Sequence, residues 1–382
     1  MILVLSLLIA VPYYALIVSF IFGFDVIKPF KSKEKEPENR FTIIIPFRNE
    51  ERSLPTLLKS ILKLDYPKEL FEIIFVDDDS EDDSAEIIKR GLDTKFLNEN
   101  ITVPDFKMLN NNRKTGSPKK DAINMAIDIA KFDWIITTDA DCIIPKNWLL
   151  SFDAFIQIKK PKLVVAPVTF ASNNHFIEQF QLLDFLSLQG STIGGFGINK
   201  PFLCNGANLC YSKLAFKEVD GFDGNASIAS GDDIFLLEKI YTKFPNQVHY
   251  LKSIEAVVKT EPQHSFKELI NQRVRWAAKS TAYNNPFSKL VSLSVFAMNA
   301  LLVLLLFTGI IGYPSWSLFS LFFGIKFLID FILLFKTATF FEQLYALKHF
   351  VISSLLYPFF IMFVIIVSLK SGYSWKGRQF KK

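Results

Sequence analysis

Long apolar runs lie at both ends of the chain, and a more polar region lies between them. The first run covers about 2–27, which at about 1.5 Å per residue is long enough to cross a hydrocarbon core of about 30 Å. Three more apolar segments follow near the C-terminus, at about 290–312, 316–335 and 350–369. The pattern predicts an N-terminal transmembrane anchor and a group of C-terminal transmembrane helices.

Within the polar region, short apolar runs alternate with segments of helical periodicity. The expected strands are FTIIIP, FEIIFV, FKML and WIITT, and the expected helices are Ser53–Leu62, Asp83–Arg90, Asp121–Lys131 and Asn147–Ile158. Strands that alternate with helices imply right-handed crossovers and a mostly parallel sheet covered by helices on both faces. We therefore predict an α/β domain flanked by transmembrane helices.

These patterns divide the chain into five parts. They are the anchor (1–27), a linker that ends in KSKEKEPEN (28–39), the α/β domain (40–288), the C-terminal transmembrane helices (289–370) and a basic tail (371–382). The α/β region has the size of one domain and shows no internal repeat. The chemistry of the chain is therefore expected in residues 40–288.

Composition supports a membrane protein. The 382 residues are 50% hydrophobic and have a mean hydropathy of +0.26, which is too apolar for a soluble protein of this size. The net charge of +5 is modest and the lysines lie beside the apolar runs, so a membrane surface is favoured and nucleic-acid binding is not expected. Cys142, Cys204 and Cys210 cannot all pair and lack metal-ligand spacing, so reduced thiols with a packing role are expected.

The charges beside the apolar runs predict an orientation. The first run lacks a basic start and an Ala-x-Ala cleavage site, so a retained anchor is expected. The lysines that follow it place the α/β domain in the cytosol by the positive-inside rule, and these are Lys28, Lys31, Lys33 and Lys35. Three complete later crossings would leave the basic tail outside the cytosol, so either the tail is external or one late segment is re-entrant or interfacial. A multi-pass protein of the cytoplasmic membrane is expected.

Two charges lie inside the third apolar run, where charges are costly. Lys326 and Asp330 are four residues apart and can meet on one helix face. A structural ion pair is expected, and contact with a lipid or glycan acceptor is the alternative.

Polar clusters directly follow three of the expected strands. FTIIIP is followed by FRNE, FEIIFV by three aspartates that begin at Asp77, and WIITT by Asp139 and Asp141. Ligands of such sheets bind at the carboxyl ends of the strands, so the clusters are expected to meet at one edge. Because residues two apart in a strand share a face, Asp139 and Asp141 can converge on one cation.

Several known phosphate and metal signatures are absent from the sequence. No GxxxxGK[ST] loop occurs, GGFGINK lacks the strand and helix of a dinucleotide fingerprint, and DDDSEDDS lacks the glycine of an EF-hand loop. The four histidines show no zinc-pair spacing. Oxygen ligands remain, and they favour Mg²⁺ or Mn²⁺ bridging to phosphates.

In this order, the motifs of about residues 40–280 resemble family 2 of the glycosyltransferases, inverting enzymes that use nucleotide sugars and have the GT-A fold. IIIPFRNEE resembles that family's opening strand and loop, FVDDDSEDDS its nucleotide-binding stretch, and TTDADCIIPKNWL its DxD motif. PKKDAINMA resembles its lysine-bearing segment, GANLCYSKLAFKEVDGF with SGDDIFLL its acceptor-side region, and QRVRW matches QxxRW. DxD alone is a weak pattern, but this order together with QxxRW is specific.

The resemblance implies a role for each matched residue. The nucleotide-sugar donor, expected to be a UDP-sugar, is implied to contact Pro46, Arg48, Asn49, Glu50, Asp77, Asp78, Lys119, Asp139 and Arg275. The implied metal ligands are Asp141 and Asp139, and the implied acceptor-pocket residues are Gly206, Gln272 and Trp276. Departure of a diphosphate builds negative charge, which bound Mg²⁺ or Mn²⁺ would offset as a Lewis acid.

QRVRW falls on an expected amphipathic helix of about Ser265–Ala282. At 3.6 residues per turn, Gln272, Arg275 and Trp276 share one face and Arg273 turns away from it. Arg275 could then meet the diphosphate. A basic helix that lies on the membrane is the alternative.

Inversion needs a base that takes the proton from the acceptor hydroxyl. Asp233 is the expected base, because it precedes IFL with the spacing of the family's Glu-Asp-x-x-Leu pattern. Asp232 stands where that pattern usually has Glu, so the choice between the two aspartates stays open. As a structural alternative, Asp232 could be the N-cap of the following helix.

One apolar segment and the number of membrane crossings bear on the acceptor. His175–Gly190 is apolar at helical spacing and fits either the membrane interface or ordinary core packing. The tethered domain resembles ceramide-type glucosyltransferases and polysaccharide synthases, and the few crossings favour transfer to a lipid or lipid-linked glycan, with a processive synthase as the alternative. A scaffold or transporter with a dead transferase fold, and a metal-dependent nucleotidyl or phosphoryl transferase, are disfavoured because the carboxylates and QRVRW occur together. No protein partner is predicted.

Overall fold

The structure is a computed structural model. It describes residues 2–32, 35–93, 102–172, 175–225, 228, 230–280, 284–370, 373–375 and 378–380. The described chain forms two compact units. The sheet unit consists of Lys28–Ala171 and Leu203–Glu261, and the helical unit of Met1–Ile27, Ser172–Phe202 and Pro262–Lys382. Parts of the predicted α/β domain, 172–202 and 262–288, thus group with the helical unit.

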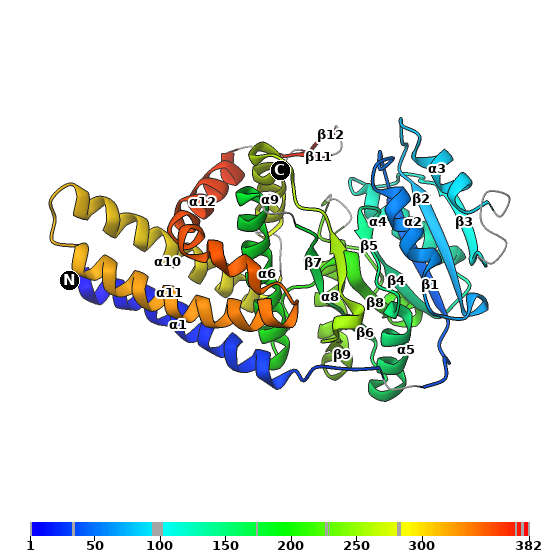
Figure 1. Ribbon diagram of the computed structural model, residues 1–382, viewed down its shortest axis with the longest axis horizontal. Coiled ribbons are helices and arrows are strands. Elements are labelled where there is room, and N and C mark those ends of the chain that lie inside the picture. The colour runs from blue at the N-terminus through cyan, green and yellow to red at the C-terminus, as the bar shows by residue number, and fades with distance from the viewer. Residues whose placement is uncertain are drawn as a thin grey trace. The chain divides into compact units, whose positions relative to one another are not determined.

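A seven-stranded, mostly parallel sheet forms the centre of the sheet unit (Figure 1). Its strands, in spatial order, are β3 (Asp105–Asn110), β2 (Phe71–Asp77), β1 (Phe41–Phe47), β4 (Trp134–Thr137), β8 (Leu209–Ser212), β6 (Leu163–Val165) and β9 (Val248–Tyr250). β8 runs antiparallel to its neighbours β4 and β6, and the other pairs are parallel. The α/β prediction and all four expected strands are confirmed.

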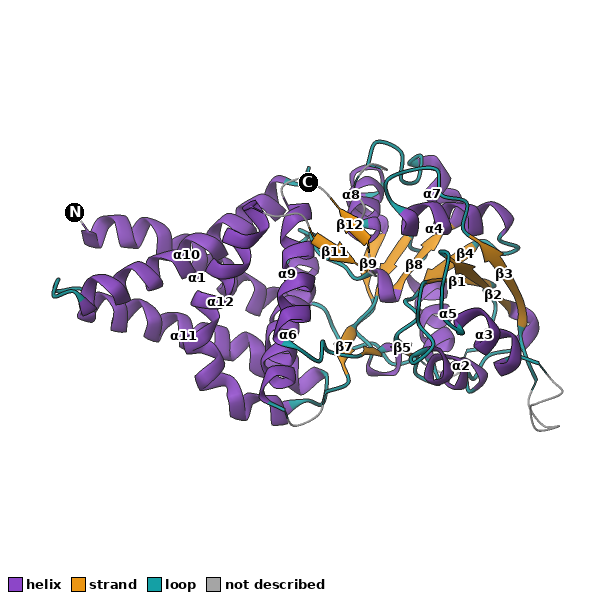
Figure 2. Cartoon of the chain, turned by 90° about the horizontal axis from the view of Figure 1, so that it is seen from above, coloured by secondary structure: helices purple, strands orange, loops and turns teal. Residues whose placement is uncertain are grey.

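Helices cover both faces of this sheet, with α2 and α3 on one face and α4 on the other (Figure 2). The helices of the sheet unit are α2 (Leu54–Leu62), α3 (Ser84–Gly91), α4 (Pro118–Ile129), α5 (Trp148–Lys159), α7 (Lys213–Glu218) and α8 (Asp232–Lys243). The first four match the predicted helices to within a few residues. α4 begins earlier than predicted, because Pro118 suits the first turn of a helix. Strand residues such as Ile43 and Ile74 are fully buried, as expected for a sheet covered on both faces.

Smaller elements complete the sheet unit. A three-stranded sheet has the order β5 (Cys142–Ile143), β10 (Val258–Thr260), β7 (Val168–Phe170). Short 3₁₀ helices lie at Lys68–Leu70, Gly206–Asn208, Pro245–Gln247 and Ile254–Ala256. All three cysteines are free, and two of them are buried, in agreement with the predicted packing role.

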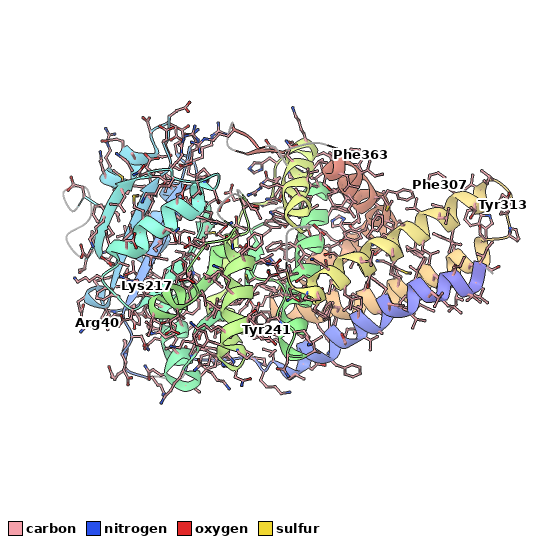
Figure 3. The ribbon with its side chains drawn as sticks, turned by 180° about the vertical axis from the view of Figure 1, so that it is seen from behind. Arg40, Lys217, Tyr241, Phe307, Tyr313 and Phe363 are labelled. Carbon is pink, nitrogen blue, oxygen red and sulfur yellow. The ribbon has the colours of Figure 1, made fainter. Side chains whose placement is uncertain are left out.

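Long helices dominate the helical unit. They are α1 (Ile2–Val26), α6 (Phe176–Gly197), α9 (Phe266–Ser280), α10 (Pro286–Ile310), α11 (Trp316–Phe340) and α12 (Phe350–Lys370), with a 3₁₀ turn at Leu344–His349 and a hairpin of β11 (Tyr373–Trp375) and β12 (Arg378–Phe380). Among the residues that the structure describes, four helical segments are long and apolar enough to cross a membrane: Ile2–Val26, Pro286–Ile310, Trp316–Phe340 and Leu344–Leu369. They correspond to the four predicted apolar runs. Side chains such as Phe307 and Phe363 project from α10 and α12 (Figure 3), and about half of each is exposed, as expected for lipid-facing positions.

Glycines allow α1 and α6 to approach closely. A Cβ atom at Gly197 would lie 1.8 Å from the carbonyl oxygen of Gly23, and one at Gly194 would lie 2.5 Å from that of Phe20. Small residues at such a crossing permit close backbone packing of membrane helices. The segment GGFG therefore packs α6 against α1, and the predicted helix 175–190 extends to Gly197 within the helical unit.

The predicted pair within the third apolar run is present. Nζ of Lys326 donates to Asp330, and the hydroxyl of Tyr13 on α1 donates to the same carboxylate at 2.8 Å. The Lys326 amine also lies 5.4 Å from the Tyr13 ring centroid. The pairing is confirmed, and it joins α11 to α1.

Candidate active site

The three predicted polar clusters meet at the carboxyl edge of the sheet. Phe47, at the end of β1, lies beside Asp77, at the end of β2. The amide of Asp78 donates to the carbonyl of Phe47 at 2.8 Å, and the amide of Thr138 donates to that of Ile44 at 3.2 Å. The loops after β1, β2 and β4 are therefore neighbours, as the parallel order predicts.

The loop after β1 is tied to the loop after β2. The side chain of Arg48 is 8% exposed, and its Nη2 donates to Oε1 of Glu81 at 2.7 Å. Asn49 adopts a left-handed conformation (φ 50°) and accepts from the amide of Glu81 at 2.8 Å, while the amide of Glu50 donates to Oγ of Ser84 at 2.8 Å. Arg48, Asn49 and Glu50, which are predicted to contact the donor, therefore also fix the shape of the loop after β1. Pro46, predicted to do the same, lies within β1.

Asp78 anchors a third loop that was not predicted. Its Oδ1 accepts from Nε of Arg113 at 2.6 Å and from Nδ2 of Asn111 at 2.8 Å. Burial alone would lower the pKa of Arg113, but the carboxylates of Asp78 and Asp79 raise it. Arg113 and Asn111 follow β3 in the segment NNNRK, so the rule applied to the other strand ends would have found them.

The DxD aspartates lie in a turn rather than on a strand. β4 ends at Thr137 and β5 begins at Cys142, so strand alternation does not orient Asp139 and Asp141, and that part of the reasoning is wrong. Asp139 accepts from Nζ of Lys119 at 2.6 Å, and Sγ of Cys142 lies 3.7 Å from Oδ1 of Asp141. Both carboxylates are partly exposed, so they can reach a ligand outside the protein.

Lys119 connects two parts of the site. It lies in the first turn of α4, and its Nζ is 2.6 Å from Oδ1 of Asp139 and 3.4 Å from Oδ2 of Asp232. Burial would lower the pKa of Lys119, but the nearby carboxylates outweigh burial and raise it well above the usual value. The amine is a fixed positive charge between the DxD turn and α8.

Asp232 and Asp233 form the first turn of α8. The N-cap is Gly231, which has a φ of 85°, so the interpretation of Asp232 as an N-cap is wrong. The side chain of Asp233 accepts from the amide of Gly206 at 3.2 Å and from that of Ile234 at 2.8 Å. Carboxylates are favoured at a helix N-terminus because its dipole is positive there.

Gly206 lies against this carboxylate pair. An added Cβ would be 3.0 Å from Oδ2 of Asp232 and 3.4 Å from Nζ of Lys119. The carbonyl of Gly206 accepts from Oγ1 of Thr137 at 2.8 Å, which fixes the backbone. The structure thus brings this predicted acceptor-side residue to the predicted catalytic residues.

QRVRW lies on α9, which belongs to the helical unit, whereas the other predicted site residues belong to the sheet unit. Arg273 is buried and pairs with Asp184 on α6 at 2.7 Å. Arg273 was expected to turn away from Gln272 and Trp276. Its side chain instead contacts both, by a hydrogen bond to Gln272 and a stack on the ring of Trp276.

Comparison with known proteins identifies related sequences. The family model described as Glycosyl transferase family 2 matches residues 42–212, and that described as Glycosyl transferase family group 2 matches residues 134–368, more than half of the chain. Poly(ribitol-phosphate) beta-N-acetylglucosaminyltransferase TarS of Staphylococcus aureus is 32% identical over 119 residues, which are 31% of this chain and only 19% of TarS. Poly-beta-1,6-N-acetyl-D-glucosamine synthase of Staphylococcus epidermidis is 26% identical over 378 residues, covering 88% of this chain and 84% of that synthase.

A solved structure shares the fold. Mannosyltransferase PcManGT from Pyrobaculum calidifontis, in complex with GDP-Man and Mn²⁺, superposes with a TM-score of 0.59 at 15% identity over 94% of this chain and 99% of that one. At this identity the likeness shows the GT-A fold alone. The fold and the family models together show that the chain belongs to family 2 of the glycosyltransferases.

Proposed function

We propose that the chain is a membrane-bound, inverting glycosyltransferase that moves a sugar from a nucleotide sugar to an acceptor hydroxyl at the cytosolic face of the membrane. One observation carries the proposal: Lys119 contacts both Asp139 of the DxD turn and Asp232 at the start of α8. The amine of Lys119 therefore lies between Asp139, proposed for the donor side, and Asp232, proposed for the acceptor side. Such an arrangement suits a reaction in which the leaving diphosphate and the attacking hydroxyl bind next to each other.

The nucleotide part of the donor is proposed to bind at the ends of β1 and β2. Asp77 and Asp78 would accept hydrogen bonds from the base or ribose. Arg113, held by Asp78 but still 34% exposed, would present its guanidinium to the same ligand. The relatives named above act on N-acetylglucosamine and the fold neighbour holds GDP-Man, so UDP-N-acetylglucosamine is the first donor to test and GDP-mannose the second.

A divalent cation, Mg²⁺ or Mn²⁺, is proposed to bind at Asp141 and Asp139. The donor set fits, because both residues offer carboxylate oxygens, which hard cations prefer. Within the described ranges no group of three or more His, Cys, Asp or Glu could hold a metal, so diphosphate oxygens and water would complete the shell. When bound, the cation would supply Lewis-acid stabilisation of the leaving diphosphate. Lys119 holds the Asp139 carboxylate in place by its hydrogen bond.

Asp233 is proposed as the base that accepts the proton of the attacking hydroxyl. Asp232 is 9% exposed and forms the ion pair with Lys119, whereas Asp233 is more exposed. The backbone amides of Gly206 and Ile234 orient the Asp233 carboxylate. Asp233 can therefore reach an acceptor, while Asp232 stabilises Lys119.

The acceptor is proposed to be a lipid or a lipid-linked glycan held at the membrane. The four helices that are long and apolar enough to cross a membrane support an acceptor of this kind. On α9, Arg275 is proposed to meet the diphosphate, and Gln272 and Trp276 to contact the acceptor, as the family resemblance implies.

A second candidate is a processive polysaccharide synthase. One observation favours it: the similarity to the poly-beta-1,6-N-acetyl-D-glucosamine synthase extends over 88% of this chain and 84% of that synthase. The two candidates predict different products. A synthase yields a long polymer, and a lipid glycosyltransferase yields a glycolipid that carries one or a few sugars.

The test uses the full chain purified in detergent. UDP-N-acetylglucosamine, UDP-glucose and GDP-mannose are supplied in turn with Mg²⁺, Mn²⁺ or a chelator, and with lipids from the producing cells as acceptors. Mass spectrometry of the products identifies a glycolipid or a polymer. Turnover that persists in the chelator, or in Asp141→Asn, would refute the metal site.

The proposed base has its own test. Asp233→Asn should abolish transfer and retain nucleotide binding by calorimetry, because the base acts on the acceptor rather than on the nucleotide. Loss of nucleotide binding together with transfer would remove Asp233 from the base role.

A further inference from the structure

An ion pair within the helical unit lies outside the proposed catalytic groups. Nε of Arg273 on α9 donates to Oδ2 of Asp184 on α6 at 2.7 Å, and the two side chains are only 7% and 5% exposed. Tyr357 on α12 lies close enough to this carboxylate for an electrostatic interaction. We call Asp184, Arg273 and Tyr357 the Asp184 cluster. It joins a helix that carries QRVRW to two other helices of the unit.

Arg273 contacts two of the motif residues. Its Nη1 donates to the side-chain oxygen of Gln272, and its guanidinium carbon lies 4.2 Å from the ring centroid of Trp276. Phe185, next to Asp184 on α6, packs against the same ring at a centroid distance of 6.3 Å. The side chains of α6 therefore support Trp276 both directly, through Phe185, and through Arg273, which also holds Gln272.

The buried charge of Arg273 depends on Asp184. A buried guanidinium is strongly destabilising unless a carboxylate compensates it. Nη2 of Arg273 is buried and has no hydrogen-bond partner among the residues that the structure describes. Removing the Asp184 carboxylate would leave this charge uncompensated and favour movement of the guanidinium. Gln272 and Trp276 would lose the support that Arg273 gives them.

We propose that Asp184 is a positioning residue for the acceptor, which acts through Arg273 on Gln272 and Trp276. This inference rests on the proposed function, in which these two residues contact the acceptor. Asp184 touches neither donor nor acceptor. Its effect is to keep the acceptor hydroxyl, rather than water, in place to attack the donor sugar. Tyr357 supports the same carboxylate from the membrane helix α12.

The experiment measures how the donor sugar is divided between acceptor and water. The full chain in detergent receives UDP-N-acetylglucosamine, with mixed micelles of total lipids from the producing cells as acceptor. Sugar transferred to lipid and free sugar released are counted in the same reaction. Their ratio does not depend on the fraction of enzyme that is folded, so a purely structural defect leaves it unchanged.

Asp184→Asn should lower this ratio about tenfold, because a small misplacement of a reacting group reduces rate steeply. Asp184→Glu, which keeps the charge, should retain most of the ratio. The control is Glu72→Gln, which removes another buried, ion-paired carboxylate, in the sheet unit, and should leave the ratio unchanged. An unaltered ratio in Asp184→Asn would overturn the proposal.

Two further variants separate positioning from stability. In Asp184→Leu/Arg273→Met, apolar side chains replace the ion pair, which commonly restores stability. The thermal midpoint should recover and the ratio of transferred to free sugar should stay low. Recovery of both would overturn the proposal.

Tyr357→Phe removes only one hydroxyl group, so the variant should fold and lower the ratio by a smaller factor. An unchanged ratio in Tyr357→Phe would also contradict the proposal. If the wild-type chain consumes none of the nucleotide sugars, the proposed function fails, whereas transfer by wild type with unaltered variant ratios refutes the Asp184 role alone.

Discussion

Lys119 donates from Nζ to Oδ1 of Asp139 at 2.6 Å. The same nitrogen lies 3.4 Å from Oδ2 of Asp232, so one amine joins the turn after β4 to the first turn of α8. Burial opposes the charge, but the carboxylates outweigh burial and raise the pKa of Lys119. Lys119 is therefore a permanent cation between the DxD turn and the carboxylates at the start of α8.

Lys119→Met keeps the length of the side chain and removes this cation. We expect kcat/KM for the nucleotide sugar to fall by about a hundredfold, because an electrostatic group next to a developing charge is lost. The measurement is initial-rate kinetics in detergent. Lys131→Met, which alters an exposed lysine 3.8 Å from Asp105, is the control and should keep wild-type kinetics.

The raised pKa of Lys119 adds a pH prediction. Because the folded-state pKa exceeds the usual lysine value of 10.5, the charged pair stabilises the fold below pH 10.5 and loses this effect as pH rises through the folded-state pKa. The difference in thermal midpoint between wild type and Lys119→Met should therefore stay constant between about pH 6 and pH 9. A wild-type loss of stability in that range that is absent from the variant would contradict the assignment.

Arg113 offers a test of the donor side. Arg113→Ala removes a charged hydrogen bond to the buried Asp78, so the KM for the nucleotide sugar should rise about tenfold while kcat changes little. Arg90→Ala is the matched control, because Arg90 is 72% exposed and pairs with Glu86 within its own helix. A fall in kcat at unchanged KM would move Arg113 from donor binding to another role.

The polar clusters at the carboxyl edge of the sheet can be predicted from the sequence, because each cluster directly follows an apolar run. FTIIIP, FEIIFV and WIITT are apolar runs that end in charged residues, and parallel order brings their ends together. The same rule would have found Arg113 after FKML. Asp139 and Asp141 were predicted as neighbours on a strand, but the strand ends at Thr137 because the chain turns there towards β5.

Other parts of the site depend on tertiary contacts that carry no local pattern. The pairing of Arg273 with Asp184 joins residues far apart in sequence, and helical periodicity indicated only that Arg273 leaves the motif face. A long side chain can fold back over its own helix, as this one does onto Trp276. Likewise, GGFG has no nucleotide-binding pattern, and its glycines are explained by close contacts with other segments, such as Gly194 with Phe20 and Gly197 with Gly23.

Gly206→Ala tests the crowding around the carboxylate pair. The new methyl group would lie 3.0 Å from Oδ2 of Asp232, so this side chain must shift by a few tenths of an ångström, and it would touch Nζ of Lys119 at 3.4 Å. We expect kcat to fall about tenfold with nucleotide binding retained, because small displacements at reacting groups reduce rate. Gly324→Ala, on α11 and open around its Cβ position, should have no effect. Wild-type kcat in Gly206→Ala would show that this backbone is not close to the reacting groups.

Glu72 provides a stability prediction that is independent of catalysis. Its side chain is fully buried at the start of β2 and accepts from Thr42 Oγ1 at 2.8 Å, from the amide of Lys131 at 2.5 Å and from Nζ of Lys107 at 2.9 Å. Burial raises the pKa of Glu72, but these donors outweigh it and lower the pKa below 4.5. The carboxylate therefore contributes stability that is present above pH 4.5 and is lost as pH falls through the folded-state pKa.

Glu72→Gln should destabilise the protein by about 1.5–3 kcal/mol at pH 7. When thermal unfolding is measured across pH, the stability difference between wild type and variant should shrink below about pH 4.5. Glu86→Gln, at an exposed ion pair, should show neither effect, and a constant Glu72→Gln difference down to pH 3 would contradict the assignment.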